Sequence, residues 1–280
     1  VFSMGWSLLI NVGNVLVIPA FSRHEHDEAF ASNLANVFFG LGAFLTPLAV
    51  TWLLRQTSFP ATLGILAGLA VVPAVLALRV DFSQFTPRAE AAVIGIAALL
   101  AAPILWLCGF ALCFSGPMEA SRGAWTTTYL RDQGVKESSA AGLLSAFWLT
   151  YMAARLITAF ALPPGNERIL ILCLALASVG VLAVMVVSRN ARLSMLLVVV
   201  CGLVFGPIFP TLVAVLLGHF PSQSHGRAVG LLFAIGGVGW TTIPMLVGSY
   251  ARRTSLQRAL VIVVGAALGL SGVAAVLLRR

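Results

Sequence analysis

The sequence predicts an all-α polytopic membrane protein with about nine transmembrane helices. Of its 280 residues, 60% are hydrophobic and only 9% are charged, whereas a soluble domain carries about 25% charge. The apolar residues form long runs, close to the roughly 20 residues that cross a bilayer as one helix. A soluble fold of this length could not bury so much apolar surface, but lipid can take the place of a core.

The apolar runs follow one another along the chain, separated by short polar segments. Their expected limits are 4–21, 31–54, 60–79, 95–121, 138–162, 168–188, 194–218, 228–250 and 257–278. Strands of a membrane β-barrel would alternate apolar and polar residues over about ten positions, whereas these runs are apolar throughout. We therefore predict helices, with no long extramembrane segment between them.

Two of the runs predict an irregular helix. Residues 91–121 are too long for one upright helix, so we expect part of this stretch to tilt or to lie along the membrane interface. The run at 194–218 contains Pro207 and Pro210 in "GPIFPTL". Each proline removes a backbone donor, so this helix is expected to bend or break near them. Such breaks line cavities in transporters, and a plain structural kink explains them equally well.

The polar residues argue against several function classes. The formal net charge is +8, but the Lys and Arg residues stand singly between apolar runs, so we expect no nucleic-acid partner. The four cysteines lie in apolar runs without metal-ligand spacing. The segment "RHEHDE" at 23–28 is more typical of a solvated turn than of a metal site. The sequence contains no P-loop, H-E-x-x-H or G-x-S-x-G pattern. We expect neither an enzyme nor a bound cofactor or metal.

Glu119 differs in position from the other acidic residues. Eight of the nine acids fall in the polar breaks, whereas Glu119 lies within or at the end of the run at 95–121. An ionisable residue at membrane depth is energetically unfavourable and predicts a functional site, here a group that binds and releases a proton. Arg122 follows three residues later on the same helix face, where it could pair with Glu119 and favour its charged form. The alternative is a solvated pair at the membrane interface.

Other polar and aromatic residues within the runs are candidates for a solute path. Asn11 and Asn14, and likewise Asn33 and Asn36, share one helix face in each of two neighbouring runs. In lipid, an Asn must face another helix or a wet cavity, so solute binding and bonding between helices remain open. Three tryptophans could stack on a solute or lie at the membrane interface, namely Trp125, Trp148 and Trp240. Arg155, near the end of its run, is expected to extend its charge to the surface.

Six segments carry a resemblance to a known family: "GWSLLINVGNVL" (5–16), "ASNLANVFFGLGAFLTPLAV" (31–50), "MEASRGAWTTTYL" (118–130), "FWLTYMAARLITAF" (147–160), "CGLVFGPIFPTLVAVLLGHFP" (201–221) and "GRAVGLLFAIGGVGWTTIPMLVG" (226–248). In this order they resemble helices four, five, seven, eight, ten and eleven of the major facilitator superfamily, in particular its fucose-permease-like branch. One position departs from that branch, because Ile10 stands where its fourth helix can carry a Glu used for proton coupling.

The resemblance implies a major-facilitator-type bundle of twelve helices in two halves, of which this chain holds the equivalents of helices 4–12. Residues 1–80 would be three helices of the N-terminal half, 81–94 the central cytoplasmic loop, and 95–280 the C-terminal half. About three earlier helices would then precede the chain. The resemblance also implies cytoplasmic termini, and we expect a monomer in the bacterial cytoplasmic (inner) membrane.

We therefore predict a secondary active transporter that moves a small solute by alternating access. The expected path residues are Asn11, Asn14, Asn36, Glu119, Arg122, Trp125 and Trp148, with Glu119 as the candidate for proton coupling, as in symport, and Arg122 beside it. Residues expected to bend or pack helices during gating are Gly206, Pro207, Pro210, Gly236, Gly237 and Gly239. The alternative function is a membrane sensor or assembly protein that uses the same bundle without transport.

Overall fold

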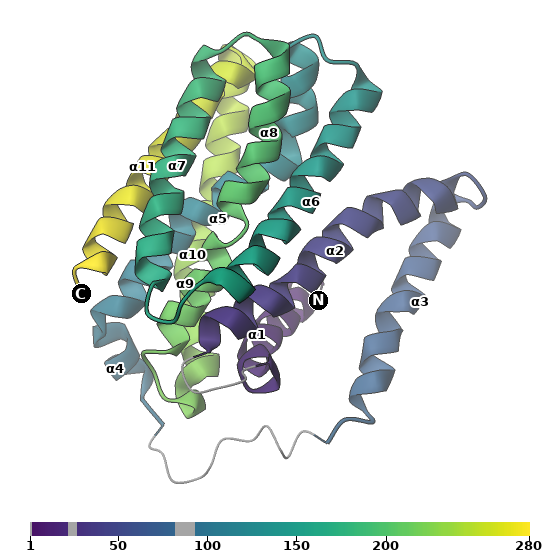
Figure 1. The fold of residues 1–280 in the computed structure, drawn as a ribbon. Helices are drawn as coiled ribbons and strands as arrows, with labels where there is room; N and C mark the ends of the chain where they lie inside the picture. Colours follow the sequence, from purple (N-terminus) through teal and green to yellow (C-terminus); the bar gives the residue numbers. More distant parts are fainter. Residues whose placement is uncertain (1, 22–26, 82–92) are drawn as a thin grey trace.

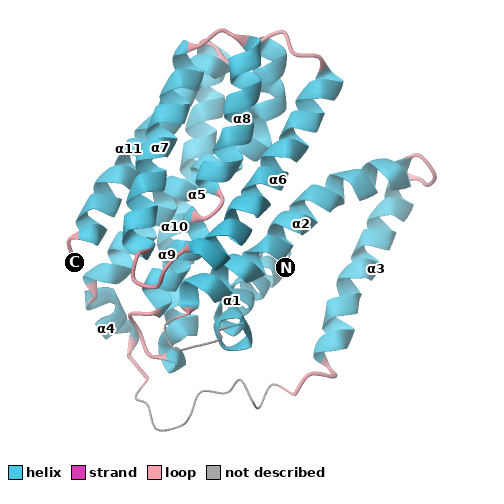
Figure 2. Ribbon diagram, viewed as in Figure 1, coloured by secondary structure: helices cyan, strands magenta, loops and turns pink. Residues whose placement is uncertain are grey.

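The computed structural model describes residues 2–21, 27–81 and 93–280, and within these ranges every regular element is a helix (Figure 2). The helices are α1 (Phe2–Phe21), α2 (Glu28–Leu54), α3 (Phe59–Ala77), α4 (Ile96–Ala101), α5 (Pro103–Asp132), α6 (Glu137–Ala161), α7 (Glu167–Val187), α8 (Ala191–Phe205), α9 (Ile208–Leu217), α10 (His225–Arg253) and α11 (Leu256–Leu278). A single 3-10 turn, Ser222–Ser224, precedes α10.

Most of these helices are suited to crossing a membrane. Among the described residues, eight segments are long and apolar enough to span a bilayer, with α8 and α9 forming one of them. Within α1, the segment Ile10–Phe21 is a further, shorter apolar helix. The predicted all-α polytopic membrane architecture is therefore confirmed.

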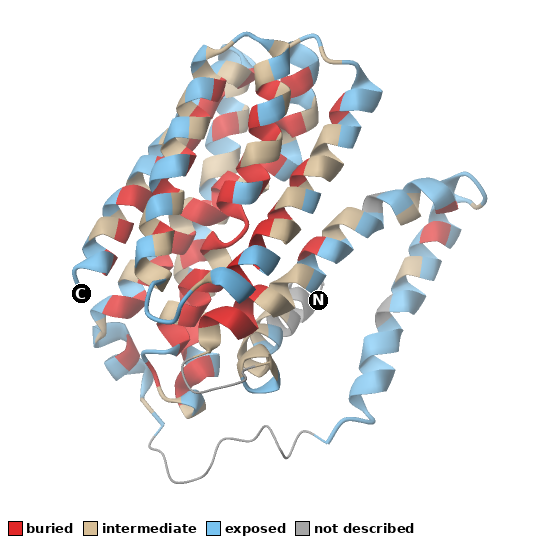
Figure 3. Ribbon diagram, in the orientation of Figure 1, coloured by how far each residue is buried: buried red, intermediate tan, exposed pale blue. Residues whose placement is uncertain are grey.

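A compact bundle forms around α5. This helix packs along α10 and α11, α11 packs along α7, and α8 with α9 fills the space between α5, α6 and α7 (Figure 1). Leu105, Leu112, Leu212, Val229 and Leu260 are among the buried residues of its core. Buried positions are concentrated in this bundle, whereas the surface of α3 is mostly exposed (Figure 3).

The first helices lie against one flank of that bundle. α2 packs on α6 and α9, and α1 packs on α2 and α10 (Figure 1). α3 contacts α2 and stands away from the bundle in the same view. Its side chains, such as Leu63 and Leu69, are apolar and exposed, which suits contact with lipid.

The expected end of the fourth apolar run is wrong, and the run is divided near its start. A short helix, α4, ends at Ala101, and the extended Ala102 precedes Pro103, which starts α5. Proline is favoured in the first turn of a helix, where its missing N–H would have no partner. α5 then continues to Asp132 instead of ending near 121. Hydropathy placed the end too early because Ser121, Arg122 and Thr126 are polar and yet buried among neighbouring helices.

The run at 194–218 is divided at Gly206 and Pro207. α8 ends at Phe205 and α9 begins at Ile208, so the interruption lies at the first of the two prolines. Pro210 lies in the first turn of α9, where its missing N–H breaks no helical bond. A Cβ on Gly206 would overlap the carbonyl oxygen of Tyr151, so glycine allows α6 to approach closely at this interruption.

Candidate functional site

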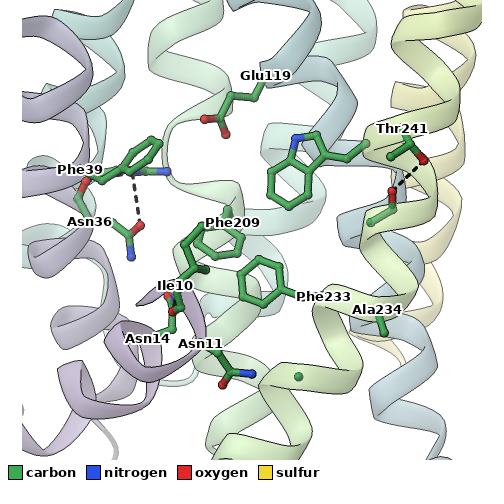
Figure 4. Close-up of a pocket in the computed structure, with 14 residues that line it drawn as sticks. Ile10, Asn11, Asn14, Asn36, Phe39, Glu119, Phe209, Phe233, Ala234 and Thr241 are labelled. Atoms are coloured by element: carbon green, nitrogen blue, oxygen red, sulfur yellow. Dashed lines mark hydrogen bonds between the residues drawn. The ribbon is translucent and has the colours of Figure 1, made fainter. Parts of the chain in front are cut away.

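A cavity of about 840 Å³ lies where α1 and α2 meet the main bundle (Figure 4). It is lined by Ile10, Asn11, Asn14, Asn36, Phe39, Glu119, Arg155, Phe209, Gly230, Phe233, Ala234, Gly237, Trp240 and Thr241. These residues come from α1, α2, α5, α6, α9 and α10. The volume lies within the range of pockets that enclose small molecules.

Four of the residues expected on a solute path line this cavity, namely Asn11, Asn14, Asn36 and Glu119. Gly237, which was expected to shape its helix, lines it as well. The asparagines reach the cavity from α1 and α2, and Glu119 projects from α5 on the opposite side (Figure 4). Two helices far from α5 in the sequence therefore complete a cavity around its half-buried acid.

Asn33 has a different role from its neighbour Asn36. Its amide nitrogen donates to the Ala29 carbonyl at 3.0 Å and to the Thr211 hydroxyl of α9 at 3.2 Å. Of the two uses left open for these asparagines, Asn33 therefore bonds between helices, whereas Asn36 faces the cavity.

A chain of hydrogen bonds connects Glu119 to the other side of the cavity. The Tyr151 hydroxyl donates to Oε2 of Glu119. Arg155 donates from Nη2 to the Tyr151 oxygen at 2.6 Å. From Nη1 it donates to the backbone oxygen of Asn36 at 2.9 Å and to its Oδ1 at 3.4 Å. Residues of α5, α6 and α2 are thus joined through one arginine.

Arg155 does not extend to the surface, and that prediction is wrong. Its side chain is 1% exposed, and its Nε donates to the Gly206 carbonyl at 2.8 Å. The guanidinium carbon lies 4.2 Å from the ring centre of Tyr151 and 5.7 Å from that of Phe39. Carbonyl oxygens and aromatic faces replace water around the cation, which makes a buried position tolerable.

A family model for the Major Facilitator Superfamily matches residues 1–241 and 123–280 of the chain. The chain belongs to the Major Facilitator Superfamily. Membership implies an integral multi-pass membrane protein, in a family that is typically not enzymatic.

Relatives of this superfamily member are distant in sequence. Bypass of stop codon protein 6 of Saccharomyces cerevisiae is 27% identical over 174 residues, which make up 58% of this chain. The match spans 35% of that protein's length.

Two solved structures of the superfamily share the fold of the chain. FucP in the outward conformation has 14% identity and a TM-score of 0.70, covering 95% of this chain and 71% of that one. A variant of the E. coli fucose:proton symporter FucP has 13% identity and a TM-score of 0.72, covering 96% of this chain and 73% of that one. The predicted major-facilitator-type bundle is therefore confirmed as a fold.

In this superfamily member, Arg122 does not contact Glu119 within the described structure. Arg122 is fully buried, and its Nη1 lies 3.7 Å from the Met185 sulfur of α7. Its Nε and Nη2 have no hydrogen-bond partner among the described residues. A three-residue step turns the helix face by about 60°, and the long side chain extends toward α7. The expected pairing of Arg122 with Glu119 is therefore wrong for this conformation.

Trp125 and Trp148 do not line the cavity either. Trp125 packs beside Gly248 of α10, and Trp148 lies edge-on to Tyr151 with ring centres 5.3 Å apart. Trp240 is the tryptophan that lines the cavity, stacked on Phe233 with ring centres 6.2 Å apart. One of the three stacking candidates thus faces the solute space.

Of the remaining helix-shaping residues, Gly236 and Gly239 serve close packing of α10. A Cβ on Gly236 would meet the Leu112 side chain at 2.5 Å, and one on Gly239 would overlap the Cys113 carbonyl group of α5. Their part in gating stays a prediction, as does that of Gly206, Pro207, Pro210 and Gly237.

Sequence reasoning missed Tyr151, Phe39, Phe209 and Phe233 as residues of the site. One signal was available in "YMAAR", since Tyr151 and Arg155 are four residues apart and therefore share a helix face. The aromatic residues had no such signal in so apolar a chain.

Two expectations fall on parts of the chain that the structure does not describe. Four residues of the "RHEHDE" turn, 23–26, lie outside the described residues. So do residues 82–92, which make up most of the expected central loop.

Proposed function

We propose that the chain forms the solute path of a secondary active transporter that works by alternating access and is coupled to protons through Glu119. The observation that carries this proposal is the cavity between α1–α2 and the main bundle, with a half-buried acid in its wall. Glu119 is the acidic residue in that lining. Buried carboxyl groups facing a cavity are typical of proton relays in membrane transporters.

The proposed division of the chain supports alternating access. In it, residues 1–80 belong to one half, 95–280 to the other, and 81–94 link them. Arg155 of α6 then joins the two halves, because its Nη1 donates to Asn36 of α2. If one half rocks against the other, this contact must break or change in each cycle.

The fucose-permease-like branch remains the proposed place of the chain within the superfamily. The shared fold with FucP supports the bundle, whereas identities of 13–14% carry no information about the solute. Ile10 lies in the cavity wall at the position where that branch can carry a Glu. We therefore assign proton coupling to Glu119, and its direction, expected as symport, stays a prediction. A monomer in the bacterial cytoplasmic membrane stays a prediction. The curated relative named above comes from a yeast.

Uptake into vesicles tests the proposal. The full-length protein, reconstituted in vesicles, should accumulate its solute in response to an imposed pH gradient. Glu119→Gln keeps the shape of the side chain but removes the titratable group, so it should abolish the response to the gradient. Glu137→Gln serves as the matched control, because Glu137 is exposed in a surface ion pair with Arg131.

Two outcomes would contradict the proposed proton-coupled transport. An undiminished gradient response in the Glu119→Gln protein would remove Glu119 from the coupling mechanism. Solute binding without any accumulation in vesicles would favour a membrane sensor over a transporter.

A further inference from the structure

We infer that the cavity takes an organic cation, a protonated amine that carries a flat apolar group. The inference rests on the proposed transport function, because it names the class of solute for the same cavity. It follows from three features of the wall, namely its aromatic rings, its hydrogen-bond acceptors and the surroundings of its two charged residues.

Aromatic rings form much of the cavity wall. Phe209 of α9 lies 5.8 Å from Phe233 of α10, and Phe233 in turn stacks on Trp240 with an angle of 10° between the rings. Phe209 and Phe233 project into the space below Glu119 in Figure 4. Such faces accept a flat apolar group, and they attract a cation through the negative faces of their rings.

The amide groups of α1 and α2 supply hydrogen-bond acceptors to the cavity. Asn14 donates from Nδ2 to the Ile10 carbonyl at 2.9 Å, and Asn36 donates from Nδ2 to the Ser32 carbonyl at 2.8 Å. A carbonyl oxygen only accepts, so the atom beside it must be the amide nitrogen. Each amide therefore keeps its Oδ1 lone pairs and one further N–H for a solute, and Oδ1 of Asn36 holds only a 3.4 Å bond from Arg155.

Thr241 adds another acceptor on the opposite wall. Its hydroxyl lies 3.1 Å from the Gly237 carbonyl and 3.0 Å from that of Val238, and donates to its own helix. A hydroxyl has one proton to donate, so only its oxygen lone pairs remain for a solute. The Asn11 amide and the Trp240 indole can still donate, but neither carries a charge that would neutralise an anion.

Arg155 is the cation in the cavity lining, and most of its donors are occupied by the protein. They reach the oxygens of Gly206, Asn36 and Tyr151. Gly206 caps the C-terminal end of α8, where the helix dipole contributes partial negative charge. With the rings of Tyr151 and Phe39 beside it, this guanidinium is compensated without a direct ion pair to Glu119.

Glu119 therefore keeps acceptor capacity for a solute. Tyr151 donates to Oε2, and no bond to Oε1 occurs among the described residues. An ammonium group has N–H donors and no acceptor, so it matches a carboxylate and amide oxygens. An anionic solute would meet these acceptors beside a guanidinium whose Nε and Nη1 are already bonded to the protein, which disfavours its entry.

Three probes of one shape and different charge test the inference: phenethylammonium, phenethyl alcohol and hydrocinnamate. Their binding to the purified full-length protein is measured by calorimetry. The ammonium probe should bind roughly tenfold tighter than the alcohol, as expected for a partly desolvated cation contact, and hydrocinnamate should bind weakest. Trp240→Leu should weaken the ammonium and the alcohol together, because it removes an aromatic face that both use.

Glu119→Gln separates charge from shape. In this variant the ammonium probe should bind no better than the alcohol, while the alcohol keeps its wild-type affinity. Glu137→Gln, at the exposed pair with Arg131, should leave all three affinities unchanged. An ammonium preference that survives Glu119→Gln would overturn the inference, as would equal or tighter binding of the alcohol or of hydrocinnamate. Absence of ammonium binding at millimolar concentration would overturn it as well.

Vesicle uptake distinguishes failure of this inference from failure of the transport proposal. Ammonium binding without accumulation of any solute would refute transport and leave the ligand class standing. Gradient-driven uptake of a solute that phenethyl alcohol or hydrocinnamate inhibits better than phenethylammonium would refute the ligand class and leave transport standing.

Discussion

At the residue scale, Tyr151 connects the two charged side chains of the cavity wall. It is fully buried, donates to Glu119 and accepts from Arg155. Its ring also packs against Phe147 and Trp148, with ring centres 5.7 Å and 5.3 Å away. The hydroxyl and the ring therefore have separable roles, one in the hydrogen-bond chain and one in packing.

Tyr151→Phe should destabilise the protein while keeping the ring in place. The substitution leaves Nη2 of Arg155 and Oε2 of Glu119 without the partner they share, and losing a buried partner costs about 1–3 kcal/mol. Thermal unfolding of the detergent-purified protein should show a lower midpoint. Tyr250→Phe, at a position on α10 that is 41% exposed, should leave the midpoint unchanged. Equal midpoints for wild type and Tyr151→Phe would show that the hydroxyl contributes no stability.

At the element scale, α5 and α10 approach so closely that glycine is required at one point of contact. A Cβ on Gly239 would overlap the Cys113 carbonyl of α5, whereas a Cβ on Gly237, two residues earlier, would have nothing within 4 Å. The two glycines thus differ in surroundings although they belong to one motif, "GGVG". Packing with α5 explains Gly239, and open space at the cavity surrounds Gly237.

Gly239→Ala and Gly237→Ala should therefore have opposite effects on stability. Alanine at 239 must push the two helices apart, and overpacking of this kind costs about 1–3 kcal/mol. Alanine at 237 meets no obstacle and gains up to about 1 kcal/mol of helix preference. Thermal unfolding of both variants provides the comparison. A Gly239→Ala protein as stable as wild type would mean that α5 and α10 are not in such close contact.

At the scale of the whole molecule, Arg155 joins parts of the chain that are far apart in sequence. Its partners belong to α2, to the interruption between α8 and α9, and to α6 itself. Among the described residues, the Arg155 guanidinium donates both to Asn36 of α2 and to the Gly206 carbonyl at that interruption. The flank formed by α1 and α2 is thus held to the main bundle by this charged side chain as well as by the Asn33–Thr211 bond and helix packing.

Arg155→Gln should loosen α2 and α6 selectively. Hydrogen–deuterium exchange, read by mass spectrometry, should rise in both helices, because a neutral side chain cannot reach all three partners. Exchange in α7 and α11 should stay low, since they pack on each other and α11 packs on α5 without Arg155. Arg131→Gln, in the exposed pair with Glu137, is the control. A uniform rise over all helices would contradict a local connecting role.

The sequence by itself determined the fold class and the acid of the site. Long apolar runs must be helices in lipid, because each backbone N–H and C=O needs a partner within its own segment. The same physical reasoning singles out Glu119. An ionisable acid at membrane depth is energetically unfavourable and is therefore a candidate for a functional site. Asn11, Asn14 and Asn36 could be proposed for a similar reason, as polar groups that cannot face lipid.

The tertiary structure decided which polar residues meet. Arg155 and Arg122 both lie in apolar surroundings in the sequence, yet the first lies in the cavity wall and the second points toward α7. Neither outcome follows from helical spacing, because long side chains choose partners on other helices. The interruption at Gly206 acquires a role only in the folded structure, where the Gly206 carbonyl accepts a hydrogen bond from Arg155. Apolar patterning is a local property of the chain, whereas pairing of buried charges depends on contacts between distant segments.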